Sequence, residues 1–227
     1  MSKSRFQKLI RRIADTLQPD PSHFLTLVNG VIHVGANTGQ ERNLYHQHNL
    51  HVLWIEPNPE IYTTLCNNLA DFPKQAALKA LLAEKDNLDT EFHIANNNGA
   101  SSSIYPLHLH RKIWPEIKFE HSIALRTQTL PSLLNANTVN IKSYDALILD
   151  TQGSELLILK GALSILSHFR YIQVEAPNFE AYRGCCLASD LEAFLTTRGF
   201  QPICKKSFAS SFGAGTYYTL VFQRSNS

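Results

Sequence analysis

The sequence lacks the features that would mark a membrane-spanning, secreted or nucleic-acid-binding chain. No apolar run approaches the roughly 18 residues that a transmembrane helix needs, and the basic amino terminus has no signal-peptide core. The net charge of +2 is too small to indicate nucleic acid as an obligate partner. The four cysteines show no C-x-x-C pair, and adjacent Cys185 and Cys186 are poorly suited to an ordinary disulfide. We therefore expect a cytoplasmic protein with reduced thiols and no transmembrane segment.

The composition places the chain among ordinary globular proteins. Hydrophobic residues make up 44% and charged residues 18% of its 227 residues, which argues against disorder and fits one α/β domain. An apolar stripe at helical spacing over residues 4–17 predicts an amphipathic helix, which Pro19 and Pro21 end. We expect residues 1–22 to form this amino-terminal helix and residues 23–227 to form a single domain, because no repeat or linker indicates another.

The stretch from Gly30 to Glu41 resembles a nucleotide-binding loop but lacks the spacing of the two common kinds. A short apolar run leads into Gly35, then three small or polar residues and Gly39, which predicts a strand, a tight turn and a helix. Asn37 stands where a dinucleotide-binding G-x-G-x-x-G loop has its middle glycine, and no Gly-Lys-Ser/Thr follows. The loop is therefore not built for a pyrophosphate.

An acidic residue follows this loop at the distance expected of a ribose-binding group. Residues 51–55 predict a second strand that ends in Glu56 and Pro57, and Glu56 stands 21 positions after Gly35. A nucleoside without pyrophosphate fits S-adenosyl-L-methionine, with its ribose on Glu56 and its amino-acid end held by backbone groups of the loop. The alternative is a glycine turn in an α/β domain that binds nothing there.

Strands and helices alternate along the rest of the chain. Further strands are predicted over residues 76–82, 91–95, 144–149, 171–174, 200–204 and 216–222, with helices from residues 58, 129, 154 and 188. This order predicts a Rossmann-like, doubly wound, mostly parallel sheet with an antiparallel carboxy-terminal edge. Residues 96–103 are small and polar, and residues 105–121 have no clear periodicity. We expect residues 96–121 to form a loop or lid insertion.

Several motifs, in order from about residue 30 to about residue 200, resemble the FkbM-type S-adenosylmethionine-dependent methyltransferases of the seven-stranded class I fold. They are Val34-Gly35-Ala36-Asn37-Thr38-Gly39, Ile55-Glu56-Pro57-Asn58-Pro59, Ser101-Ser102-Ser103, Leu149-Asp150-Thr151-Gln152-Gly153-Ser154-Glu155, and Leu159-Lys160-Gly161-Ala162. No single motif is specific, but the ordered set is. His33 departs from the pattern, since class I enzymes usually carry an acidic residue there.

The resemblance implies S-adenosyl-L-methionine as the cofactor and Asp150 beside its methyl group. The candidate cofactor-binding residues are Gly35, Ala36, Asn37, Thr38, Gly39, Glu41, Glu56, Pro57, Ala83 and Asp150.

Two carboxylates that end predicted strands are the catalytic candidates. Methyl transfer to a hydroxyl needs a group that draws off the proton, and Asp150 could orient the acceptor or act as this base. A structural role in its turn is the alternative. For Glu175, hydrogen bonding to the substrate or a structural role is the alternative to catalysis. His108 and His110 have no third ligand at a known spacing, so we predict no metal site.

The absence of an Asn-Pro-Pro-Tyr signature after the Asp150 strand favours oxygen over a base amino group as the acceptor. We expect an O-methyltransferase that acts on a hydroxyl of a small molecule such as a sugar, a glycan or a secondary metabolite. The alternative is a non-catalytic nucleoside-binding or partner-binding module with the same fold. The sequence leaves the oligomeric state open.

Overall fold

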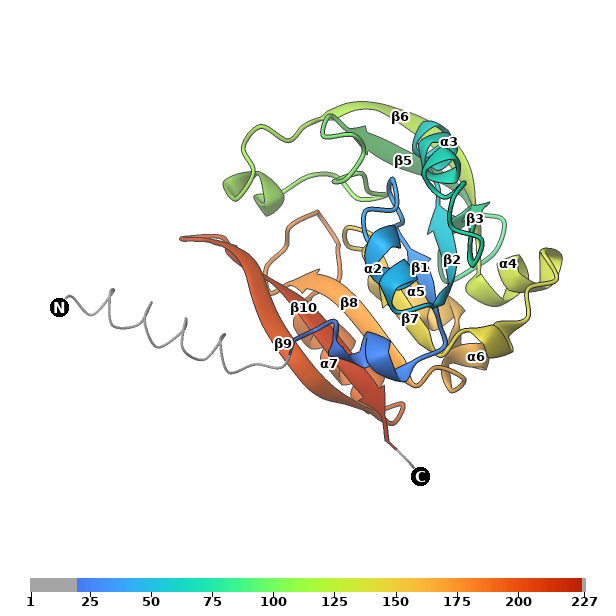
Figure 1. Cartoon of the computed structure of the whole chain (residues 1–227). Helices are drawn as coiled ribbons and strands as arrows, with labels where there is room; N and C mark the ends of the chain where they lie inside the picture. Colours follow the sequence, from blue (N-terminus) through green and yellow to red (C-terminus); the bar gives the residue numbers. More distant parts are fainter. Residues whose placement is uncertain (1–19, 226–227) are drawn as a thin grey trace.

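A computed structural model describes residues 20–225, which are built around one seven-stranded sheet (Figure 1). The strand order is β3-β2-β1-β7-β8-β10-β9. The bounds are β1 (Gly30–Val34), β2 (His51–Glu56), β3 (Gln75–Lys79), β7 (Ala146–Leu149), β8 (Tyr171–Pro177), β9 (Phe200–Ser211) and β10 (Gly215–Arg224). The first five strands in this order pair in parallel, and β10 pairs antiparallel with both β8 and β9. The predicted doubly wound sheet with an antiparallel carboxy-terminal edge is confirmed.

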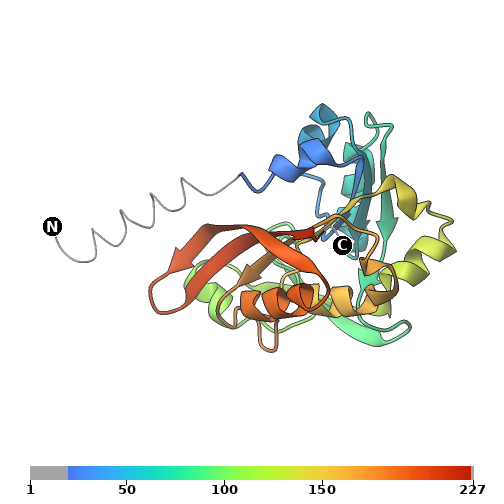
Figure 2. The same ribbon diagram turned by 90° about the horizontal axis from the view of Figure 1, so that it is seen from below.

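Helices cover both faces of this sheet, so its central strands are buried on both sides. Figure 2 shows α2, in blue, on one side of the sheet and α7, in orange-red, on the other. One layer contains η1 (His23–Leu27), α2 (Arg42–Gln47) and α3 (Pro59–Asn68); the other contains α4 (Leu130–Ala136), α5 (Glu155–Gly161), α6 (Leu163–Leu166) and α7 (Ala188–Thr196). Val31 packs in the first layer and Ile32 in the second, and both are fully buried. This double burial explains the near-continuous apolar strands.

Local signals placed several helix ends correctly. The Asn58 side chain accepts hydrogen bonds from the amides of Glu60 and Ile61, and Pro59 occupies the first turn of α3. Gly199, with φ of +81°, follows the end of α7.

Of the four cysteines, all within residues 20–225, none forms a disulfide.

The helix predicted from Ser154 differs from expectation in two ways. It breaks at Ala162 into α5 and α6, and Leu163 of α6 is 48% exposed. The Ser154 hydroxyl makes no capping bond to the helix. The carboxylate of Glu155 instead accepts from the amides of Thr151 and Gly153, so the turn before the helix has its own internal acceptor.

A second, three-stranded sheet in the order β4-β6-β5 was missed (Figure 1). Its strands are β4 (Leu81–Leu82), β5 (Asp89–Ala95) and β6 (Phe119–Gln128). The run predicted as one strand over residues 76–82 splits at Ala80 and serves both sheets. Most of the expected excursion over residues 105–121 precedes β6 and contains only one short helix, η2 (Leu109–Lys112). Pairing between β5 and β6 spans a long loop, which no local pattern encodes.

The amino-terminal helix expected over residues 1–22 falls almost entirely outside the residues described. Within residues 20–225, no helix has the length and apolar character required to traverse a bilayer.

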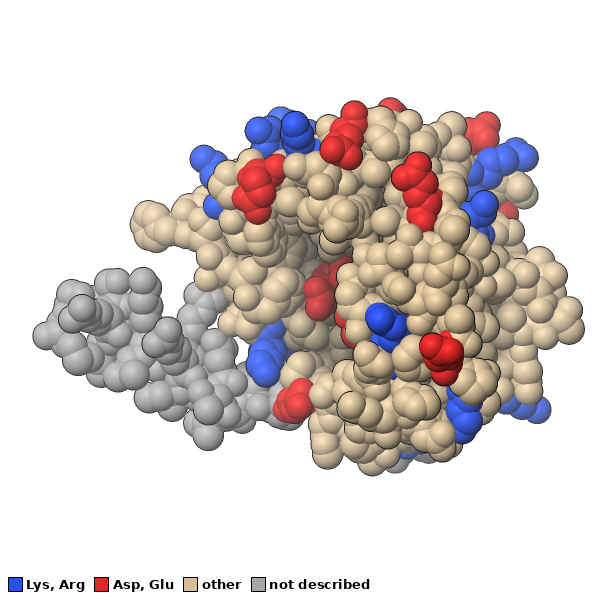
Figure 3. All heavy atoms as spheres, turned by 45° about the horizontal axis from the view of Figure 1, so that its top comes forward, with Lys and Arg blue, Asp and Glu red and all other residues tan. Residues whose placement is uncertain are grey.

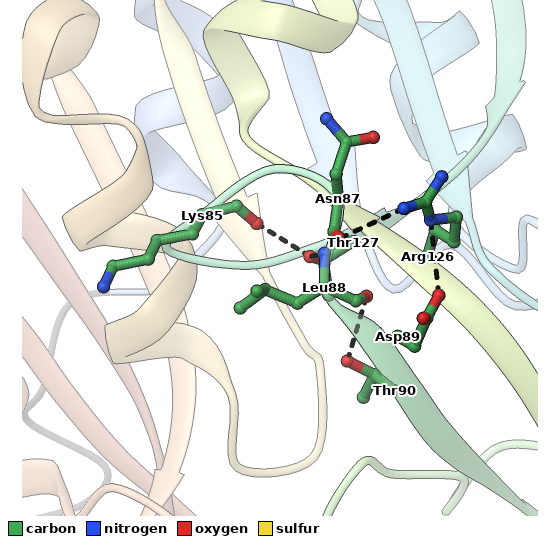
Figure 4. Close-up of polar contacts among 7 residues, drawn as sticks. All are labelled: Lys85, Asn87, Leu88, Asp89, Thr90, Arg126 and Thr127. Atoms are coloured by element: carbon green, nitrogen blue, oxygen red, sulfur yellow. Dashed lines mark hydrogen bonds and ion pairs between the residues drawn. The ribbon is translucent and has the colours of Figure 1, made fainter.

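Thr127, 2% exposed on β6, anchors the loop that joins β4 to β5 (Figure 4). Its hydroxyl donates to the carbonyl of Lys85 at 2.7 Å and accepts from the amide of Leu88 at 3.1 Å. Its backbone also pairs with this loop, because Asn87 N donates to Thr127 O and Thr127 N donates to Leu88 O. One side chain therefore satisfies both a donor and an acceptor of a loop with few buried apolar residues.

Replacing Thr127 with valine keeps the shape of the side chain but removes both hydroxyl bonds. We expect Thr127→Val to lower the free energy of unfolding by about 1–3 kcal/mol, because two backbone groups lose their partner. Thr90→Val is the matched control: its hydroxyl makes one solvent-exposed bond of 3.4 Å to Leu88 O, and we expect a change within about 0.5 kcal/mol. Urea unfolding of the three proteins checks this, and equal stability of both variants would contradict it.

Candidate functional site

A cleft of about 860 Å³, counted to its open mouth, lies at the carboxyl edge of the large sheet. Its walls come from the ends of four neighbouring strands: Val34 at the end of β1 with Gly35 after it, Glu56 at the end of β2, Ala80 after β3 and Asp150 after β7. Ligands of doubly wound sheets bind in this crevice. Figure 3 shows the hollow with acidic side chains at its floor.

The close approach of the β1 and β7 ends depends on Gly35. Its φ is +81°, and a Cβ placed on it would lie 1.8 Å from the carbonyl oxygen of Asp150. Neither the conformation nor the space admits another residue. The amide of Asp150 donates to Val34 O at 3.0 Å, so the two strand ends remain paired up to the point where their loops separate.

The glycine loop turns its amides inward, where each of them donates a hydrogen bond within the protein. The amides of Gly35 and Ala36 donate to Ile55 O, and that of Asn37 donates to Glu56 Oε2. Those of Thr38 and Gly39 donate to Asn37 Oδ1 and Ala36 O. All five amides are therefore engaged, and the carbonyls of Ala36, Thr38 and Gly39 also accept bonds within the protein.

Glu56 lines the cleft from a buried position, with only 6% of its surface exposed. Its two oxygens accept from the amides of Asn37 and Asn58, each at 2.9 Å. These bonds fix the carboxylate between the glycine loop and the start of α3. Each oxygen retains a lone pair, so the carboxylate can accept from two neighbouring hydroxyls of a ribose.

Six of the ten residues proposed for the cofactor line this cleft: Gly35, Asn37, Glu41, Glu56, Pro57 and Asp150. Four do not, namely Ala36, Thr38, Gly39 and Ala83. Ala36 belongs to the core beneath α2 and α3, Thr38 O accepts from Asn68, and a Cβ on Gly39 would meet Leu65. Ala83 packs its carbonyl against Gly161 of α5, because the chain has by then passed the cleft with Ala80, Leu81 and Leu82.

The remaining walls come from segments to which sequence reasoning gave no such role. His33 is buried, contacts the Tyr45 hydroxyl at 2.9 Å and stacks on Trp54, a fully buried core residue. Leu81 of β4 and Phe92 of β5 form an apolar wall. Burial holds the pKa of His33 below its ordinary value, so its ring is neutral at pH 7.

The small polar segment over residues 96–103, part of the expected loop or lid insertion, is partly buried. Ser101, Ser102 and Ser103 are all buried. Ser102 Oγ accepts from Ala95 N, and Ser103 Oγ donates to Gln152 O. Ser102 lines the cleft, and Ser101 lines a second pocket. This segment therefore forms a wall between two cavities.

The second pocket, which we call the aromatic pocket, contains Glu175 rather than the cofactor candidates. It is lined by His110, Trp114, Tyr182, Phe208, Tyr217 and Glu175, together with smaller residues. Gln152 lines both the cleft and the aromatic pocket. The structure thus separates the two predicted catalytic carboxylates, with Asp150 in the cleft and Glu175 in the adjoining pocket.

A chain of hydrogen bonds leads from Asp150 into the aromatic pocket. Gln152, which has a left-handed φ of +55°, donates from Nε2 to Asp150 Oδ1 at 2.7 Å and accepts from the Tyr182 hydroxyl at 2.9 Å. Farther in, His110 contacts Ser101 Oγ at 3.2 Å and the Tyr217 hydroxyl at 2.7 Å. His108, its predicted neighbour on one face, instead contacts Glu180. Sequence reasoning missed His110 because its partners lie far away in the chain.

Carboxylates crowd the junction of the two cavities. Burial and the neighbouring charges of Glu175 and Glu155 raise the pKa of Asp150 well above its ordinary range. Burial and the charge of Glu41 raise the pKa of Glu175 to about 7. These groups repel one another when ionised, so a cation placed among them would relieve the repulsion.

The donor set of the cleft fits S-adenosyl-L-methionine. Glu56 can accept from a ribose diol, Leu81 and Phe92 provide apolar surface, and the carboxylates of Glu41 and Asp150 are suited to the positive charges of an ammonium and a sulfonium. Replacing Gly35 tests whether the β1–β7 approach shapes this site. Gly199 is the matched control, since its φ is also +81° but nothing lies within 4 Å of a Cβ there.

We expect Gly199→Ala to lower the free energy of unfolding by about 1 kcal/mol from backbone strain alone. Gly35→Ala adds a clash with Asp150 O, so we expect about 2 kcal/mol or more of further loss. Urea unfolding measures both, and equal losses would show that the contact has no such importance.

The stability of the cofactor-free protein should fall as the pH rises. Burial raises the pKa of Glu56 from 4.5 to about 7, so its contribution is fully present below pH 4.5 and is lost through pH 7. We expect the free energy of unfolding to decrease from pH 5 to pH 8, with Glu56 supplying about 2–3 kcal/mol of the decrease. Urea unfolding across this range should show that the free energy of unfolding of Glu56→Gln decreases less steeply with pH than that of the wild type. A pH dependence as steep in Glu56→Gln as in the wild type would contradict the buried state of Glu56.

Comparisons with known proteins agree with this architecture. The methyltransferase FkbM domain matches residues 33–202, which is 170 of the 227 residues. A curated relative, 2-O-methyltransferase NoeI of Sinorhizobium fredii, is 23% identical over 186 residues that cover 78% of this chain and 72% of NoeI.

Two solved structures share the fold at low sequence identity. Sp1610 of Streptococcus pneumoniae, solved with S-adenosyl-L-methionine, has a TM-score of 0.50 at 12% identity, covering 100% of this chain and 75% of its own. TrmK of M. capricolum, solved with S-adenosyl-homocysteine, has a TM-score of 0.51 at 8% identity, covering 91% and 68%. The chain therefore belongs to the FkbM family of S-adenosyl-L-methionine-dependent methyltransferases.

Proposed function

We propose that this protein transfers the methyl group of S-adenosyl-L-methionine to a hydroxyl of a sugar, a glycan or a secondary metabolite held in the aromatic pocket. The observation that carries the proposal is the position of Asp150, which lines the cleft next to the aromatic pocket. Its carboxylate accepts a hydrogen bond from Gln152, and Gln152 lines both cavities. Support for oxygen as the acceptor comes from the relative NoeI, which is named a 2-O-methyltransferase.

The cofactor, when bound, supplies a methyl carbon already activated by its positive sulfur. The protein must then align the acceptor and remove its proton. Gln152 holds Asp150 Oδ1 and leaves Oδ2 for the acceptor hydroxyl. As the hydroxyl oxygen forms its bond to the methyl carbon and the carbon–sulfur bond breaks, its proton passes to Asp150.

The raised pKa of Asp150 suits this role. A base works best when its pKa lies near the working pH, and burial beside other carboxylates moves Asp150 in that direction. Glu175 faces the acceptor side, where it can accept a hydrogen bond from a second hydroxyl of the same molecule.

Loss of the Glu56 carboxylate should abolish tight cofactor binding. We expect Glu56→Ala to weaken S-adenosyl-L-methionine binding by about 100-fold, the equivalent of two lost charge-assisted hydrogen bonds. Glu60, an exposed carboxylate in the first turn of α3, is the matched control, and Glu60→Ala should leave the affinity unchanged. Isothermal titration calorimetry measures both. Wild-type affinity in Glu56→Ala, or no binding by the wild-type protein, would remove the basis of the enzyme assignment.

Asp150→Asn tests the base. With methyl-labelled cofactor at saturation and the small-molecule extract of a strain lacking the gene as acceptor, we expect labelled product from the wild type and a rate at least about 100-fold lower from the variant. Asp71→Asn, on the surface, is the control. Wild-type rates in Asp150→Asn would refute the role of Asp150 alone. Cofactor binding without any labelled product would instead favour a non-catalytic binding module.

A further inference from the structure

The aromatic pocket has a wall of rings and an acidic group, and this combination limits what can enter it. Resting on the proposed function, we propose that the pocket selects an uncharged, hydroxylated ring as acceptor and rejects phosphorylated or carboxylated counterparts, with Glu175 as the residue that sets this specificity.

The wall is a contiguous set of rings. The centroid of Tyr217 lies 5.3 Å from that of Trp114 and 5.7 Å from that of Phe208, and His110 lies 4.7 Å from Trp114. These rings come from three separate segments: the loop that precedes β6, strand β9, and strand β10. The three segments meet only in the folded protein. Flat apolar faces bind the apolar face of a ring, while a few polar groups orient it.

The polar groups of the pocket offer acceptors rather than cations. Within residues 20–225, no lysine or arginine lines either the cleft or the aromatic pocket. His110 provides no positive charge, because burial lowers its pKa to about 4 and both ring nitrogens are engaged. A phosphate or carboxylate here would lose its water without gaining a charged partner.

Glu175 is available for a hydroxyl donor. Its only hydrogen bond recorded among the described residues is a long one of 3.4 Å from Thr219 Oγ1, so it has unused acceptor capacity toward the pocket. A neutral polyol donates O–H bonds to such a carboxylate. An anionic group would face the charge of Glu175 at pH 8, where this carboxyl is mostly ionised.

Trp114 gives a binding signal that does not depend on catalysis. The sequence has two tryptophans, and the other, Trp54, is fully buried in the core. With the protein saturated by S-adenosyl-homocysteine at pH 8, where Glu175 is mostly ionised, Trp114 fluorescence can be titrated with sugars. The probes are glucose, galactose and mannose, each beside its 6-phosphate and its uronic acid, and Trp114→Phe supplies the blank.

We expect at least one neutral sugar to bind with a dissociation constant about tenfold or more below those of its two acidic counterparts. Glu175→Gln should lower the ratio of the acidic-sugar to the neutral-sugar dissociation constant by about threefold or more, since it removes the charge and keeps the shape of the side chain. Glu180→Gln, an exposed carboxylate outside the pocket, should leave the ratio unchanged.

Three results would overturn the proposal: acidic sugars that bind as tightly as neutral ones, a ratio unaffected by Glu175→Gln, or no response of Trp114 to any of the sugars. Failure of the proposed function has a different signature. In that case neutral sugars bind selectively, but no methyl label reaches them or any metabolite in the extract.

Discussion

The contact between Gly35 and the main-chain carbonyl of Asp150 is the constraint on which the site depends. It lets β1 and β7 remain hydrogen-bonded neighbours to their last residues. Beyond that point the two chains leave toward opposite faces of the sheet, one into α2 and the other into α5. The crevice that opens between them is the cleft, so the position of Asp150 follows from the backbone rather than from its side chain.

The second feature that defines the molecule is its concentration of buried carboxylates. Glu56, Asp150 and Glu175 all have raised pKa values, because burial disfavours their charged forms; for Asp150 and Glu175, neighbouring acids add to the effect. Such a cluster lowers the stability of the empty protein at neutral pH. A cationic ligand relieves the repulsion among these carboxylates. The same charges that destabilise the free protein therefore favour binding of the positively charged cofactor that the family uses.

Much of this organisation could be predicted from sequence, because strand ends and loop spacing are local signals. The doubly wound sheet with its antiparallel edge, the start of a helix at Asn58, and the places of Glu56 and Asp150 on the cleft followed from them. What could not be predicted depends on contacts distant in the chain. The aromatic pocket combines residues from the loop that precedes β6 with residues of β9 and β10, and the bond from His110 to Tyr217 joins positions 107 residues apart. The inward turn of the loop amides depends likewise on Ile55 and Glu56 of the neighbouring strand β2.

A crystal structure with S-adenosyl-homocysteine tests the central claim most directly. It should place both ribose hydroxyls within hydrogen-bonding distance of Glu56, the ammonium group among the acidic side chains of the cleft, and the sulfur facing Asp150 and the mouth of the aromatic pocket. A nucleoside bound away from Glu56, or a sulfur turned away from Gln152 and the aromatic pocket, would contradict the account.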